Sequence, residues 1–307
     1  MIRLSHRQPM PEALRGAIIA LGNFDGFHLG HQAVVGEALR WARADNRPVI
    51  IATFDPHPVR FFKPDAEPFR LTTLDQRQDL FAAAGADAML VFHFDAALAG
   101  LSAQSFVSDL LGQHLGASGV VTGQDFTFGK GRGGSPQVLR EVGAQAGIES
   151  RAVGPVFDGQ GPISSSRIRD ALKSGDCAEA AQLLTRPFAV RGIVQHGDKN
   201  GRLLGFPTAN LDMASYLRPL YGIYAVKGRL PDGRILDGAA NLGIRPSFDP
   251  PKELLEPHFF DFAEDLYGQE IEVEFHAFLR GEAKFASLDA LKVQMARDCD
   301  AARAVLK

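Results

Sequence analysis

The stretch AIIALGNFDGFHLGH, residues 17–31, decides how the first half of the chain folds. Its opening residues, 17–21, are all apolar, which is typical of a strand buried on both faces, and residues 31–44 continue with apolar residues at helical spacing. The alternation recurs, with strands predicted at 48–54, 88–92 and 119–122 and helices at 74–84, 102–111 and 135–146. Strands that alternate with helices predict a parallel sheet covered by helices on both faces.

The second half has a different pattern, which begins after Arg186 and Pro187. Strands are predicted there at 188–194, 221–230, 234–241 and 271–278, with little helix between them. A hairpin turn at Asp232 and Gly233 fits a mainly β domain, a small antiparallel barrel completed by one helix at 287–304. Helices at 165–174 and 176–184 are expected to close the α/β domain, which places the two domains at 1–185 and 186–307.

Composition limits the class of protein. The 307 residues suffice for two domains, and a formal charge of -3 gives no general attraction to nucleic acid or a membrane surface. No apolar run reaches the roughly 18 residues of a membrane span, and the N-terminus lacks a signal-peptide core. Cys177 and Cys299 lie far apart outside any C-x-x-C spacing, which argues against a disulfide framework or a thiolate zinc site. We therefore expect a cytoplasmic protein.

The turn GNFDGFHLGH, residues 22–31, carries the strongest chemical signal. Its glycines let the backbone approach a ligand, and free amides at a helix start favour an anion. His28 and His31 can face the same way and donate hydrogen bonds to phosphate oxygens. Two other interpretations stay open for such a pair. One is a capping loop with incidental histidines, and the other is a metal site, although no Cys or His cluster completes one.

A Walker P-loop is excluded, because the nearest candidate, GQDFTFGKG at 123–131, has one residue too many between its glycines and lacks the following Ser or Thr. Three other segments follow predicted strands or open a helix: TFDPHP at 53–58, GQDFTFGKGRGG at 123–134 and ISSSRIR at 163–169. Taken singly, each also fits a turn, a flexible loop or a capped helix.

In this order, and with the H-x-G-H pattern, these segments resemble the adenylyltransferase half of the prokaryotic riboflavin kinase/FAD synthetase family, a Rossmann-like nucleotidyltransferase. The resemblance implies that ATP is bound by Gly22, Asn23, Phe24, Asp25, His28, His31, Ser165, Ser166 and Arg167. It implies that His28, His31 and Arg167 act in catalysis. It also implies that the flavin of FMN lies near Phe54, Pro56, Pro58, Asp125 and Phe128. Ser166 stands where we expect Thr, and the hydroxyl is kept.

The second half carries GDKNGRLLGFPTANL at 197–211, a polar stretch suited to a flap over phosphates. Thr208 and Asn210 share one face if the chain is extended, and their oxygens are hard donors suitable for Mg²⁺. A turn followed by an ordinary strand end is the other interpretation. Further on, Glu256 alternates into an apolar, strand-like run, which suits a general base. Alone, it equally fits a surface carboxylate on an edge strand.

The order PTAN, then NLGIRPSF at 241–248, then E-P-H followed by DLYG resembles the riboflavin kinase domain. The resemblance implies that Glu256 accepts a proton from the ribityl 5′-hydroxyl as that hydroxyl attacks the γ-phosphate of ATP. It implies that Thr208 and Asn210 bind Mg²⁺ and nucleotide phosphate, and that the C-terminal helix shields the flavin. The further residues implied are Gly197, Lys199 and Arg202 for ATP and Arg245 for the flavin. Ser247 stands where we expect Thr.

The two motif sets together imply a bifunctional enzyme that phosphorylates riboflavin to FMN and then adenylylates FMN to FAD. Riboflavin, FMN, FAD, ATP, ADP and pyrophosphate are its expected ligands, with Mg²⁺ beside ATP and no nucleic acid or membrane partner. Two rivals remain. One is a single-activity adenylyltransferase whose barrel only docks flavin, and the other is a non-enzymatic flavin sensor.

Overall fold

The computed structural model describes residues 1–196, 206–245 and 252–307, and the chain divides into two compact units. Unit 1 comprises Met1–Ala66 and Leu74–Ile163, and unit 2 comprises Glu67–Thr73 and Ser164–Lys307. The helices expected at 165–174 and 176–184 therefore belong to unit 2, although their place in the chain suggested that they close the first domain.

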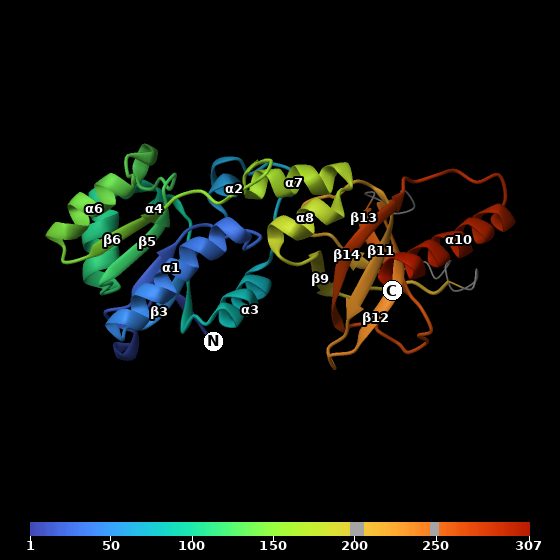
Figure 1. Cartoon of the computed structure of the whole chain (residues 1–307), viewed down its shortest axis with the longest axis horizontal. Helices are drawn as coiled ribbons and strands as arrows, with labels where there is room; N and C mark the ends of the chain where they lie inside the picture. Colours follow the sequence, from blue (N-terminus) through green and yellow to red (C-terminus); the bar gives the residue numbers. More distant parts are fainter. Residues whose placement is uncertain (197–205, 246–251) are drawn as a thin grey trace. The chain divides into compact units, whose positions relative to one another are not determined.

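The centre of unit 1 is a six-stranded parallel sheet (Figure 1). Its strands are β1 (Ile2–Ser5), β2 (Ile18–Leu21), β3 (Val49–Asp55), β4 (Ala88–His93), β5 (Gly119–Gly123) and β6 (Glu149–Val153), in the spatial order β1-β4-β3-β2-β5-β6. The strand order reverses between β2 and β5. Open parallel sheets bind their ligands beyond the carboxyl ends of the strands at such a point.

Helices cover both faces of this sheet, as the alternating pattern predicts. They are α1 (Leu29–Asp45), α2 (Pro58–Phe62), α3 (Leu74–Ala84), α4 (Ala96–Gly100), α5 (Ala103–Ser105), the π-helical η2 (Phe106–His114) and α6 (Pro136–Gln145), with single 3₁₀ turns at Glu12–Leu14 and Lys130–Arg132. Because successive strand residues point to opposite faces, Ile18 shares one apolar cluster with Trp41 of α1. Ile19 shares the other with Phe106 of η2 and Leu139 of α6.

Two strands of the sheet carry no apolar pattern and were not predicted. β1 and β6 form the two edges of the sheet, and their sequences, IRLS and ESRAV, leave most residues half-buried or exposed. An edge strand packs on fewer neighbours than a central one, so it needs fewer apolar residues and leaves a weaker signal in the sequence. A small hairpin of β7 (Phe157–Asp158) and β8 (Gly161–Pro162) ends the unit.

Gly119 in β5 allows α1 to approach the sheet. A Cβ at this position would lie 2.3 Å from Cη2 of Trp41 and 2.7 Å from Cδ1 of Ile18. Gly119→Ala is therefore expected to destabilise unit 1 by about 1–3 kcal/mol, the usual cost of overpacking a core. Trp41 is the single tryptophan of the chain, so its fluorescence during urea unfolding reports on this contact.

The matched control for this prediction is Gly100→Ala. An added methyl group at Gly100 meets no atom within 4 Å, and the backbone there is not left-handed. Equal urea midpoints for the two variants would contradict the packing argument.

Unit 2 is built on an antiparallel, nearly closed six-stranded barrel (Figure 1). Its strands are β9 (Phe188–Ile193), β10 (Leu211–Asp212), β11 (Gly222–Arg229), β12 (Ile235–Arg245), β13 (Lys252–Phe259) and β14 (Glu270–Arg280), in the spatial order β10-β13-β12-β11-β14-β9. The predicted turn at Asp232 and Gly233 joins β11 to β12, where Gly233 has a φ of 89°. A bridge between Gln195 and Asn210 brings the two end strands together.

Three helices pack on the barrel. The long α10 (Leu288–Leu306) covers Ala225 of β11 and Ala239 of β12 through Cys299 and Ala302, so the predicted C-terminal helix is confirmed. The pair α7 (Ser165–Ser174) and α8 (Cys177–Leu184) lies against the barrel, with α8 contacting β14 and β9. Cys177 and Cys299 are both buried thiols and form no disulfide. In the described parts of the chain, no helix is both long enough and apolar enough to cross a membrane.

Candidate active sites

His28 caps the first helix of unit 1 with its own ring. Its Nδ1 accepts hydrogen bonds from the backbone N–H groups of Gly30, at 3.1 Å, and His31, at 3.4 Å. This corrects one expectation, because these two amides of the first turn donate to the imidazole and are not left for a ligand. A Cβ at Gly30 would lie 3.1 Å from Cε1 of His28, so the glycine gives the ring room to fold over the helix end.

The cap determines which nitrogen of His28 can serve a ligand. A ring nitrogen that accepts from backbone N–H groups carries no proton, so the hydrogen of the neutral ring is on Nε2, which is then a donor. The His31 ring stacks on that of His28 with the centroids 3.6 Å apart. The structure therefore brings together the two histidines that the sequence selected, at the start of one helix.

The backbone between β2 and α1 is held in an uncommon conformation. Phe24 and Phe27 have φ values of 50° and 45°, in the left-handed region that costs a residue other than glycine roughly 1–3 kcal/mol. Both rings are buried and pack edge-on against Phe81 of α3, which compensates for the strain. Phe24 is 2% exposed, so its ring belongs to the core, and only its backbone is available to ATP.

A buried arginine supports this turn from below. Arg77 of α3 is 2% exposed and donates to the backbone oxygen of Asn23, at 3.1 Å, and to Oγ1 of Thr53, at 2.7 Å. The Thr53 hydroxyl in turn donates to the same Asn23 oxygen, at 2.7 Å. Gly22 donates to Ala52 of β3. The sequence did not reveal Arg77, because an arginine within a helical pattern normally points to solvent.

Two buried oxygens face the point where the strand order reverses. Within the described residues, Oδ1 of Asn23 and Oγ1 of Thr122 are buried and make no hydrogen bond. Asn23 follows β2, and Thr122 comes one residue after Val121, which pairs with Ala20 of β2. Because a buried polar atom without a partner is costly, these oxygens are suited to a polar ligand. Thr122 was not among the residues that the sequence indicated.

The predicted flavin contacts of unit 1 divide into core and surface residues. Phe54 and Phe128 are each 6% exposed and belong to one apolar cluster, so only an edge of each ring is accessible. Pro56 and Pro58, at the end of β3 and the start of α2, are half-buried, and Asp125 is exposed. Phe62, which the sequence analysis passed over, is 66% exposed beside the ring of Phe94.

The predicted hydroxyl and guanidinium groups of ISSSRIR lie at the start of α7 in unit 2. Ser164 is the N-cap, and its Oγ accepts from the backbone N–H of Arg167 at 3.3 Å. Ser165 and Ser166 follow in the first turn. The guanidinium of Arg167 donates to Oε1 of Glu179 in α8, at 2.8 Å from Nε, so its positive charge is paired within the unit.

The barrel places a carboxylate between two asparagines. Leu211 of β10 pairs with Leu255 of β13, and Ala209 donates to the backbone oxygen of Pro257 at 2.9 Å, which continues the same register. This register sets Asn210 opposite Glu256. On the other side of β13, Asn241 of β12 pairs with Glu256. Side chains of paired residues lie on one face, so the three form a polar row across three strands.

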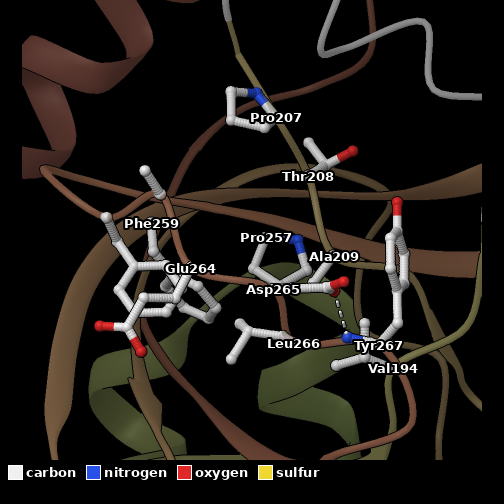
Figure 2. Close-up of a pocket in the computed structure, with 12 residues that line it drawn as sticks. Val194, Pro207, Thr208, Ala209, Pro257, Phe259, Glu264, Asp265, Leu266 and Tyr267 are labelled. Atoms are coloured by element: carbon white, nitrogen blue, oxygen red, sulfur yellow. Dashed lines mark hydrogen bonds between the residues drawn. The ribbon is translucent and has the colours of Figure 1, made fainter.

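A pocket of about 360 Å³ lies beside this row (Figure 2). Thr208 and Tyr267 line one side of it, and Glu264 lies on the other. The ring of Tyr267 lies 3.9 Å from that of His196, between centroids. The volume is at the lower end of small-molecule sites and accommodates part of a nucleotide.

The polar groups of this pocket are partly fixed in place. Oδ1 of Asp265 accepts from the backbone N–H of Tyr267 at 2.9 Å (Figure 2). Arg234, after the β11–β12 turn, donates to both carboxylate oxygens of Glu264, at 2.6 and 2.8 Å. These hydrogen bonds from Arg234 lower the pKa of Glu264, so it is ionised at neutral pH.

The donor set fits a magnesium ion that keeps most of its own ligands. Thr208 and Asn210 offer neutral oxygens, and Asn210 is only 6% exposed. No group of three or more His, Cys, Asp or Glu side chains able to hold a metal ion occurs among residues 1–196, 206–245 and 252–307. Mg²⁺ suits such a place, because it is usually bound by one or two protein oxygens with phosphate and water completing the octahedron.

Some predicted residues cannot be placed. Gly197, Lys199 and Arg202 lie outside the described residues. The backbone of Arg245 pairs with Lys252, but its side chain is outside the described part.

Comparisons with known proteins agree for both halves. A family model described as FAD synthetase matches residues 10–167, and one described as riboflavin kinase matches residues 184–306. Proteins named bifunctional riboflavin kinase/FMN adenylyltransferase are similar along most of their length. The Escherichia coli K12 protein is 41% identical over 92% of this chain and 90% of its own, and the Bacillus subtilis protein is 37% identical over the same shares. The Haemophilus influenzae protein is 39% identical over 95% and 94%.

One solved structure is similar over nearly the whole chain. A crystal structure described as a macrolide-efflux protein from Streptococcus pneumoniae matches with a TM-score of 0.87 and 30% identity, covering 99% of both chains.

Proposed function

Because this chain belongs to the bifunctional riboflavin kinase/FMN adenylyltransferase family, we propose that it divides its two reactions between residues 186–307 and 1–185. The chain phosphorylates riboflavin to FMN and adenylylates FMN to FAD, using ATP in both steps. We also propose a cytoplasmic location, since both reactions consume ATP and both cysteines are unpaired thiols.

In the kinase reaction, Glu256 accepts the proton of the ribityl 5′-hydroxyl as this oxygen attacks the γ-phosphate of ATP and ADP leaves. The observation that carries the assignment is the register of β10 and β13, which sets Asn210 opposite Glu256. A base must lie within hydrogen-bond reach of the proton that it removes, and the metal and phosphate ligands must lie beside it. Thr208 and Asn210 hold Mg²⁺, which when bound neutralises charge on the phosphates.

The pocket between Thr208 and Glu264 receives part of the ATP, with its phosphates toward Thr208. Gly197, Lys199 and Arg202 cover these phosphates in the loop at 192–202, and Arg245 and the C-terminal helix contact the flavin. These four residues and the shielding helix remain predictions from the sequence.

In the adenylyltransferase reaction, the FMN phosphate attacks the α-phosphate of ATP, and pyrophosphate leaves. The nucleophile is already an anion, so the protein contributes position and charge and needs no strong base. Nε2 of His28 donates to phosphate oxygen, with His31 beside it. The flavin lies near Pro56, Pro58 and the exposed ring of Phe62. ATP contacts by Asp25, Ser165, Ser166 and Arg167 remain predictions.

The assay that tests this division supplies the pure protein with riboflavin, ATP and Mg²⁺ and separates the flavins by chromatography. We expect FMN and then FAD, and neither after chelation of the metal. Thr208→Val is expected to raise the Mg²⁺ concentration for half-maximal FMN formation by roughly tenfold, because one oxygen ligand is lost.

Thr208→Ser, which keeps the hydroxyl, is the matched control, and FAD formation from supplied FMN should be unchanged in both variants. FAD from FMN without any FMN from riboflavin would favour the single-activity adenylyltransferase. Binding of flavin without turnover would favour the sensor. An unchanged Mg²⁺ requirement in Thr208→Val would remove Thr208 from the metal site.

A further inference from the structure

We propose that Asn241 is a positioning residue of the kinase reaction, whose side-chain amide orients the carboxylate of Glu256. Nδ2 of Asn241 donates to Oε2 of Glu256 at 3.3 Å, and the two residues are directly paired between β12 and β13. The inference rests on the proposed function, because it takes Glu256 as the base.

The pairing makes this contact a consequence of the sheet. Directly opposed residues of antiparallel strands have their Cβ atoms about 5 Å apart, so an Asn and a Glu reach each other without moving the backbone. On the adjacent pair of positions, Leu242 and Leu255 point to the other face and are both fully buried. A shift of register would expose these leucines, so the core fixes Asn241 against Glu256.

The amide performs a task that an apolar or acidic residue cannot. By donating to Oε2, it favours the charged form of the carboxylate and leaves Oε1 for the substrate hydroxyl. Asn210 flanks Glu256 from β10, so the base is placed between two neutral amides.

Other charged groups face the same region. His258 follows two residues later on β13, with Nδ1 2.8 Å from the backbone oxygen of Pro207, and Asp212 of β10 is on the face of Asn210. From α10, Asp298 is bound by Arg280, and Arg303 lies over the ring of Phe260. The described charges of α10 are thus engaged elsewhere.

Glu282, after β14, makes the neutrality of Asn241 important. A Cβ built on Gly243, two residues beyond Asn241 on the same face, would lie 2.2 Å from Oε1 of Glu282 and 3.7 Å from Nδ2 of Asn241. A second carboxylate therefore approaches the amide that holds Glu256. An aspartate at position 241 would add a third negative charge and replace the donor with an acceptor.

The test compares the pH dependence of riboflavin phosphorylation in the wild type, Asn241→Asp and Asn241→Ser. The carboxylate of the first variant is expected to raise the pKa of Glu256, because like charges disfavour ionisation. The acid limb of the kcat profile should move up by about one pH unit or more, and kcat at pH 7 should fall by roughly 10–100-fold and recover at higher pH. KM for ATP and riboflavin should change little.

Asn241→Ser keeps a donor and should retain the wild-type acid limb. FAD formation from supplied FMN is the internal control for all variants. A role of Asn241 in folding alone would lower the amount of active kinase without moving its pH profile, so an unmoved acid limb in active Asn241→Asp overturns the proposal. If that variant does not fold, loss of kcat in Asn241→Ala with rescue in Asn241→Ser supports the proposal, and equal kcat in both overturns it.

The double variant Glu256→Gln/Asn241→Asp separates this inference from the function on which it rests. If Glu256→Gln alone keeps the kinase rate, then Glu256 is not the base and the proposed mechanism fails. If Glu256→Gln abolishes the rate while Asn241→Asp behaves as the wild type, only the role of Asn241 fails. We expect Asn241→Asp to have no further effect once Glu256 is replaced, because the two act through one carboxylate.

Discussion

Glu256→Gln lowers FMN formation by on the order of 10²–10⁴-fold, the usual contribution of a general base, while FAD synthesis from supplied FMN continues. The amide of glutamine still fits the row between Asn210 and Asn241 but cannot take the proton of the ribityl hydroxyl. Rates of FMN formation from riboflavin and of FAD formation from FMN, measured on one preparation, give both values.

The matched control is Glu270→Gln, an exposed carboxylate of the same unit at the start of β14. It should leave both rates unchanged. A Glu256→Gln variant that loses both activities equally would show that the two reactions do not have separate sites. One that loses neither would return Glu256 to the reading as an ordinary surface carboxylate.

Replacing both His28 and His31 with Ala abolishes FAD formation and leaves FMN formation from riboflavin intact. Removing even one preorganised donor to developing phosphate charge costs on the order of 10²–10³-fold in rate. However, the double variant also removes the cap of α1, because Nδ1 of His28 accepts from two backbone amides. Loss of a cap costs about 1 kcal/mol, so activity alone does not separate the two roles.

His28→Asn makes that separation. Asparagine caps a helix through its side-chain oxygen but offers no donor where Nε2 of His28 lies. We expect this variant to keep the wild-type urea midpoint by Trp41 fluorescence and to lose at least a hundredfold in FAD formation. If it keeps FAD synthesis while the double alanine variant merely unfolds unit 1, the histidines are a capping loop. If the double variant stops FMN formation, the division of labour between the units is wrong.

The periodic elements of both units could be predicted because each one buries its own apolar pattern. The strand Val49–Asp55 and the helix Leu74–Ala84 match the runs at 48–54 and 74–84 closely. The edge strands β1 and β6 escaped, since an edge needs little burial. Residues 102–111 form a short α-helix followed by the π-helix Phe106–His114, a difference in hydrogen bonding that apolar spacing does not distinguish.

The candidate sites follow the same division. His28 and His31 could be found because three residues of one helix separate them, and Thr208 and Asn210 because they alternate on one extended segment. By contrast, Arg77 supports the turn at Asn23 across 54 positions of sequence. The buried rings of Phe54 and Phe128 illustrate the opposite error, because an aromatic residue near a motif is as useful to the core as to a ligand.

The sequence by itself determined which segments are strands and helices, which two motif sets the chain carries and which chemistry they serve, since these depend on neighbours within one or two turns. Only the tertiary structure decided that Nδ1 of His28 is used by the helix, and that Glu256 stands between Asn210 and Asn241. The reason is that strand register and helix packing are set by the burial of whole faces, a sum over distant residues. No local pattern records that sum.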